Sequence, residues 1–179
     1  MPTLLRLVKL VDALSDRFAA VAQWAVLAAC LISAGNAAVR YGLDLSSNAW
    51  LEIQWYLFAA CVMLGAAQVL RRNEHVRVDV FYGRLSGRGK VLVDLLGLVF
   101  FLMPVMLLML WLSVPLFLQM LATQEMSSNV GGLIRWPVML MLPLGFALLL
   151  LQGAAEIVKR IAWLMHRHEM DTHYDRPLQ

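Results

Sequence analysis

The chain has 179 residues, of which 61% are hydrophobic and only 15% are charged. Soluble globular domains are about 45–50% apolar and about 25% charged, because polar side chains must cover their surface. This composition excludes a soluble domain, a disordered chain and a disulfide-stabilised scaffold, and it indicates an integral membrane protein. The net charge of +3 does not point to nucleic acid, because the basic residues are confined to particular segments.

Four stretches lack Asp, Glu, Lys and Arg and are long enough to cross a bilayer core of about 30 Å, which takes about 20 helical residues. The sequence therefore predicts an all-α integral membrane fold with four transmembrane helices, at about 18–39, 50–70, 91–114 and 137–157. The third span contains Pro104, which is expected to kink it. We interpret residues 1–179 as a single four-span domain that ends in a cytoplasmic tail at about 158–179.

The segment before the first span has the pattern of an amphipathic helix. Its apolar residues fall at helical spacing, at Leu4, Leu7, Val8, Val11 and Leu14. Its charged residues lie mostly elsewhere on the helical wheel. We predict an amino-terminal amphipathic helix that lies on the membrane surface, with a simple cytoplasmic extension of the first span as the alternative.

Basic residues are concentrated on one side of the predicted topology. Of the 15 Lys and Arg residues, 13 lie before the first span, between the second and third spans, or after the fourth. Short loops rich in Lys and Arg stay in the cytoplasm, so both termini are predicted to be cytoplasmic. The same basic residues are expected to contact anionic membrane lipids, and no nucleic-acid partner is expected.

Small side chains form rows in the first two spans. One row contains Ala22, Ala25, Ala29 and Ser33, and the second span repeats alanine at a spacing of seven, as at Ala60 and Ala67. Small residues let helix backbones approach each other inside a membrane. These rows predict helix contacts, either within the four-helix unit or with another subunit.

The external ends of the spans carry several candidate residues. Arg40 and Glu52 are expected where the first two spans meet, as an ion pair or, alternatively, in contact with substrate. Trp50 and Trp136 fit anchors at the membrane interface. The polar and glycine-rich segment 124–132 predicts an exposed turn.

The sequence contains no recognisable catalytic, cofactor-binding or metal-binding constellation, so an enzyme is not predicted. All four His residues lie outside the predicted spans, which argues against haem ligation. The span interiors also lack the ionisable group that a self-sufficient ion-coupled transporter usually keeps within the membrane. Neutral polar residues such as Gln152 remain, and these bridge helices by hydrogen bonds. We therefore interpret the chain as a supporting subunit.

Two blocks of sequence point to a family. The first runs from Trp50-Leu51-Glu52 through Leu64-Gly65-Ala66-Ala67 to His75-Val76-Arg77-Val78-Asp79. The second is Ser127-Ser128-Asn129-Val130-Gly131-Gly132-Leu133-Ile134-Arg135-Trp136-Pro137, followed by Leu142-Pro143-Leu144-Gly145-Phe146 and Gln152. With these blocks, its size and its four-span layout, nearly the whole chain resembles the small membrane (permease) subunit of tripartite ATP-independent periplasmic (TRAP) transporters.

The resemblance implies a place in the bacterial inner membrane and two protein partners, a large permease subunit and a periplasmic substrate-binding protein. The large subunit would carry the substrate, commonly an organic acid, and couple its uptake to a sodium gradient. The small subunit would be a non-catalytic scaffold without cofactors. Candidate structural or interface residues are Arg40, Trp50, Glu52, His75, Asp79, Asn129, Trp136 and Gln152.

The external loops, around 40–50 and 125–136, are also expected to help dock the binding protein. Two other functions stay open. One is an assembly or anchor subunit of another membrane complex, which would co-purify with redox or sensor partners. The other is a small autonomous exporter that works as a homodimer, which would transport solute when reconstituted alone.

Overall fold

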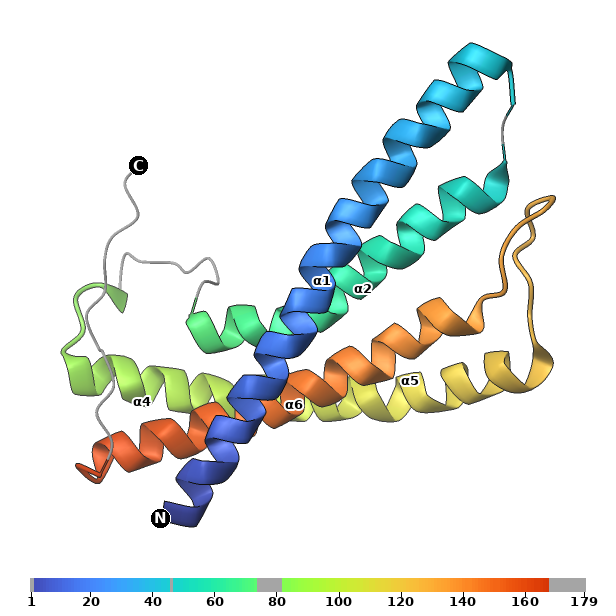
Figure 1. Cartoon of the computed structure of the whole chain (residues 1–179). Helices are drawn as coiled ribbons and strands as arrows, with labels where there is room; N and C mark the ends of the chain where they lie inside the picture. The colour runs from blue at the N-terminus through green and yellow to red at the C-terminus, as the bar shows by residue number, and fades with distance from the viewer. Residues whose placement is uncertain (1, 46, 74–81, 168–179) are drawn as a thin grey trace.

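The computed structural model describes residues 2–45, 47–73 and 82–167, which form long helices (Figure 1). The helices are α1 (Pro2–Leu43), α2 (Asn48–Arg72), α4 (Gly87–Gly97), the π-helical turn η1 (Leu98–Leu102), α5 (Met103–Thr123) and α6 (Trp136–Leu164). With α4, η1 and α5 joined into one, this gives four helical segments in the described residues that are long and apolar enough to cross a membrane. The predicted all-helical architecture with four spans is confirmed.

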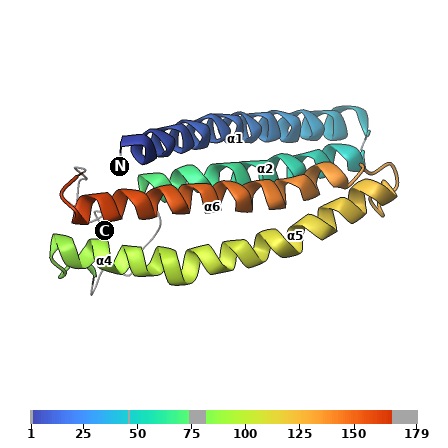
Figure 2. The ribbon, with the colours of Figure 1, turned by 90° about the horizontal axis from the view of Figure 1, so that it is seen from below.

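The helices lie in an order that places α6 at the centre of the contacts. Figure 2 shows α1 on one side and α4–α5 on the other, with α2 and α6 between them. Helix α6 contacts α1, α2 and all three parts of the α4–η1–α5 segment. We call the end where α1 and α4 begin and α2 and α6 end the basic end, and the opposite end the loop end.

Helix α1 differs from its prediction, because residues 2–43 form one continuous helix of about 63 Å. The structure shows no break between the amino-terminal segment and the first span, as in the alternative of a simple extension. The position of this segment on the membrane surface stays a prediction. No Gly or Pro interrupts residues 3–34. Val8, Ser15 and Ala19 are buried along one face. The contact face of the first span therefore continues into the amino-terminal segment.

The third span is longer than predicted and runs from Gly87 to Thr123. Its π-helical turn has a physical cause in Pro104, which has no N–H and whose ring would clash with a carbonyl of the preceding turn. The N–H of Met103 donates to the carbonyl of Leu98, five residues back, and this shift lets the helix continue past the proline. The turn packs closely on α6, since a Cβ at Gly153 would lie 2.8 Å from Leu102 Cδ2.

Small residues allow the central helices to approach each other. Ala22, Leu64, Ala67 and Leu148 form a buried cluster that joins α1, α2 and α6. A Cβ at Gly65 would lie 3.7 Å from Ala22 Cβ, which is ordinary contact. At the level of Ala22 and Ala67, the predicted rows of small residues therefore mark contacts within the four-helix unit.

Candidate functional site

Glu52 is the centre of a cluster at the loop end of the molecule. It lies in the second turn of α2 and is only 4% exposed. Its Oε1 accepts one hydrogen bond from the Ser127 hydroxyl and a second one from Asn129 Nδ2, which lies 2.7 Å away. Its Oε2 accepts from the Leu133 backbone N–H at 2.7 Å. Both carboxylate oxygens thus accept hydrogen bonds from the connection between α5 and α6. We call the set of Glu52, Ser127, Asn129 and Leu133 the loop-end cluster.

Two further residues of α2 hold the same connection. Asn48 Nδ2 donates to the Val130 carbonyl at 3.0 Å, and the Tyr56 hydroxyl donates to the Ile134 carbonyl at 3.1 Å. Asn48, Glu52 and Tyr56 are four residues apart, so they lie along one face of the helix. This face binds the connection at three successive levels and ties the hairpin of α5 and α6 to α2.

Gly132 lets the backbone come close to the carboxylate. A Cβ at this position would lie 2.6 Å from Ser127 Cβ and 2.9 Å from Glu52 Oε1, which is too close for either contact. The neighbouring Gly131 has a φ of +70°, a conformation that glycine adopts without strain. The contact with α2 therefore requires Gly132, and the backbone conformation of the turn favours glycine at 131, although Val130 at the tip is 91% exposed.

The predicted ion pair between Arg40 and Glu52 is not found. Donors from the connection occupy both oxygens of Glu52, and Arg40 on α1 is exposed. Trp50 is also exposed, and Trp136 is half-buried at the start of α6. The cluster thus unites two of the predicted residues, Glu52 and Asn129.

Replacing Glu52 with glutamine is expected to release the connection from α2, because an amide nitrogen cannot accept the bonds that the carboxylate accepts. The backbone amides of residues 127–135 should exchange with deuterium faster by roughly tenfold or more, since local opening controls their exchange. Hydrogen–deuterium exchange measured by mass spectrometry checks this. Glu125→Gln is the matched control, because Glu125 pairs with Arg135 where both side chains are about 40% exposed. Equal protection of residues 127–135 in the two variants would contradict the conclusion that Glu52 holds the connection on α2.

A second cluster joins three helical segments at the basic end. Gln152 of α6 is fully buried at its centre. The Ser15 hydroxyl of α1 donates to Gln152 Oε1 at 2.7 Å, and Gln152 Nε2 donates to Asp12 Oδ1 at 3.0 Å and to Glu156 Oε1 at 3.1 Å. The predicted role of Gln152 as a neutral bridge between helices agrees with these bonds.

Charged residues surround this glutamine and pair with one another. Lys159 Nζ lies 2.8 Å from both Asp12 Oδ1 and Glu156 Oε1. Arg160 Nη1 lies 2.6 Å from Glu156 Oε2, and its Nη2 lies 3.2 Å from Asp94 Oδ2 on α4. We call this set the basic-end cluster, and it comprises Asp12, Ser15, Asp94, Gln152, Glu156, Lys159 and Arg160.

A neighbouring group connects α1 to α2. Arg71 forms an ion pair with Asp16 and donates a hydrogen bond to the Asp12 carbonyl at 3.1 Å. Gln68 Nε2 donates to Asp16 Oδ1 at 3.1 Å. Together with the basic-end cluster, these contacts link α1, α2, α4 and α6 at the same end of the molecule.

Most residues of the basic-end cluster were not predicted from the sequence. Asp94 and Glu156 lie near the ends of the predicted spans, and Lys159 and Arg160 lie in the predicted tail, whereas α6 continues to Leu164 and buries Glu156 and Arg160. The spacing contained a signal, since residues three and four positions after Glu156 return to the same face of the helix. The pairing of that face with Asp12 and Asp94 depends on the tertiary fold.

The chemistry of the two clusters is that of structural contacts. In both clusters, the carboxylates accept hydrogen bonds or pair with cations, and several of these contacts join different segments of the chain, so the networks fix the helices relative to one another. No group of three or more His, Cys, Asp or Glu suited to a metal ion occurs in the part of the chain that the structure describes. His75 and Asp79, two further predicted residues, lie outside the described residues.

One comparison with known proteins identifies the family of the chain. A family model described as "Tripartite ATP-independent periplasmic transporters, DctQ component" matches residues 29–162. The matched segment contains the whole loop-end cluster and the α4 and α6 parts of the basic-end cluster. Comparison with curated proteins and with solved structures gives no match. Because the match covers most of its length, the chain belongs to the DctQ component family, the small permease subunit of tripartite ATP-independent periplasmic transporters.

Proposed function

We propose that this subunit is the fixed scaffold of a sodium-coupled importer of organic acids. It works with a large permease subunit, which carries substrate and coupling ions, and with a periplasmic binding protein that delivers the substrate. The observation that supports the scaffold role is the basic-end cluster, in which Asp12, Asp94 and Glu156 are all engaged by Lys159 and Arg160.

A group that couples transport to an ion must bind that ion and release it again during each cycle. In this subunit, a carboxylate of the basic-end cluster would have to leave a buried cation to do so. Breaking a buried ion pair costs about 3–5 kcal/mol, because the remaining charge has no partner. The cluster is therefore suited to hold helices in place, and the coupling site belongs to the large subunit.

The outer surface is suited to a hydrophobic environment on several sides. Family membership and the four apolar helices make the chain a multi-pass protein of the bacterial inner membrane. Large apolar side chains point outward from α1 and from the α4–α5 segment, and Trp24, Phe101 and Trp111 are each about 70% exposed. We infer that lipid covers part of this surface and that the large subunit covers the rest.

The charge distribution supports an orientation. Of the 15 basic residues, 13 lie in the sequence before the first span, between the second and third spans, or after the fourth, so we place the basic end and both termini in the cytoplasm. The loop end then faces the periplasm, where the exposed tip at Val130 is available to the binding protein.

Replacing Val130 with aspartate is expected to weaken the docking of the binding protein and therefore to lower uptake. Unchanged docking and uptake in this variant would remove the loop from the proposal.

Reconstitution with defined components tests the function. Liposomes that contain both membrane subunits should accumulate an organic acid when the binding protein and an inward sodium gradient are present. Omission of the small subunit, or replacement of sodium by potassium, should abolish accumulation. Full uptake by the large subunit and binding protein without this chain would contradict the scaffold role. Co-purification with redox or sensor proteins in place of the large permease would favour an anchor subunit.

A further inference from the structure

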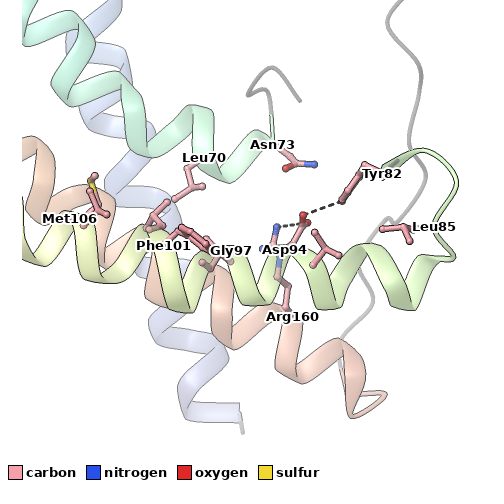
Figure 3. Close-up of a pocket in the computed structure, with 13 residues that line it drawn as sticks. Leu70, Asn73, Tyr82, Leu85, Asp94, Gly97, Phe101, Met106 and Arg160 are labelled. Atoms are coloured by element: carbon pink, nitrogen blue, oxygen red, sulfur yellow. Dashed lines mark hydrogen bonds and ion pairs between the residues drawn. The ribbon is translucent and has the colours of Figure 1, made fainter. Parts of the chain in front are cut away.

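A pocket of about 780 Å³ opens between α2 and the α4–η1–α5 segment (Figure 3). It arises because α2 and α5 both pack on α6, on different sides of it. Gly97 lines the pocket, and no atom lies within 4 Å of the place where a Cβ would stand. The space beside this glycine is therefore free for an occupant.

The lining of the pocket is divided along the helix axis. Phe101, Leu102 and Met106 make one part apolar, toward the middle of the third span. Asn73, Asp94 and Arg160 line the other part, at the basic end. An occupant that matches this lining has a long apolar part and a polar group at one end.

The polar part contains an unsatisfied donor. Arg160 is 6% exposed, and its Nη1 and Nη2 pair with Glu156 and Asp94, but its Nε has no hydrogen-bond partner among the described residues. Buried donors of this kind almost always have an acceptor in native proteins. The Asp94 carboxylate, which faces the same space, is already engaged by Arg160 and by the Tyr82 hydroxyl. The Nε atom is itself enclosed, so an oxygen-rich group at this end of the pocket would become its acceptor after a shift of the Arg160 side chain toward the opening.

We propose that the pocket binds one glycerophospholipid, with an acyl chain along Phe101 and Met106 and the glycerol ester and phosphate oxygens toward Arg160. Arg84 and Arg88 lie before and at the start of α4, at the same end, and favour a phosphate there.

Native mass spectrometry of the full transporter, purified in mild detergent, tests the proposal. The unmodified small subunit should retain a phospholipid, and Gly97→Phe, which fills the pocket, should lose it. Leu96→Phe is the matched control, because Leu96 is on the same helix and is 54% exposed outside the pocket. It should keep the lipid. Absence of lipid from the unmodified protein, or equal retention in both variants, would overturn the proposal.

A second measurement does not depend on the folding of the filled variant. A photoreactive phenylalanine in place of Val93, which also lines the pocket, should crosslink to a phospholipid in the intact transporter. Crosslinking to the large subunit instead would overturn the proposal in favour of a protein occupant. After lipid depletion, phosphatidylglycerol and phosphatidylethanolamine are added separately, and the lipid that binds more tightly shows which head group the pocket prefers. If neither lipid binds, the proposal is also overturned. No step measures transport, so the outcome is independent of the scaffold proposal.

Discussion

Replacement of Arg160 with leucine is expected to lower the free energy of unfolding by about 3–5 kcal/mol, the usual loss when one partner of a buried ion pair is removed. The variant would leave Glu156, which is 4% exposed, without its guanidinium partner and would separate Asp94 from α6. Since the ion pair between Arg160 and Asp94 joins α6 to α4, the basic end of the third span should also loosen. Denaturation of the purified subunit in detergent, followed by tryptophan fluorescence, measures the loss.

Arg135→Leu is the matched control for this experiment. Arg135 forms a salt bridge of similar length with Glu125, at 2.6 Å, but the two side chains are 40% and 43% exposed. Exposed pairs of this kind contribute about 0–1 kcal/mol, because water and salt screen them. A loss for Arg160→Leu no larger than that of the control would show that the basic-end cluster does not hold the helices together.

The second large effect is expected at Gly145, where α6 packs tightly against α2. A Cβ at this position would lie 2.7 Å from Met63 Cβ and 2.8 Å from the Met63 carbonyl oxygen. The backbone carbonyl cannot move aside as a flexible side chain does, so the helices would have to separate. Gly145→Ala is therefore expected to destabilise the subunit by about 1–3 kcal/mol, as overpacking of a core does.

The same substitution at Gly97 provides the comparison. A Cβ there meets nothing within 4 Å, and alanine favours the helical backbone by about 0.5–1 kcal/mol over glycine. Gly97→Ala should thus leave stability unchanged or raise it slightly. Thermal unfolding of both variants in the same detergent measures the difference. A similar effect at the two glycines would mean that the close approach of α2 and α6 does not limit stability.

The sequence predicted the spans because hydrocarbon imposes a simple rule on composition, and a run of about 20 residues without charge satisfies it. It did not predict where those helices end. Val8 and Ser15 continue the buried face of α1 beyond the apolar run, and Arg160 continues that of α6. In both cases, contacts with other helices extend the helix, and such contacts cannot be seen in a local window of sequence.

The sequence identified Glu52, Asn129 and Gln152 as candidates but not the way in which they are used. Glu52 and Asn129 belong to two sequence blocks that resemble the family, and the structure joins these blocks through a hydrogen bond of 2.7 Å. The sequence suggested Arg40 as the partner, because opposite charges at the same end attract. Neutral donors from the connection occupy the carboxylate instead. Partners 75–81 residues away in sequence are determined by the tertiary fold.

The most direct test of the scaffold role is transport by this subunit alone. The purified chain should be reconstituted into liposomes without any other protein, and an inward sodium gradient should be imposed in the presence of an organic acid. We predict no accumulation above that of empty liposomes, while the same preparation supports uptake once the large subunit and the binding protein are added. Accumulation of the acid by the chain alone would contradict the scaffold account.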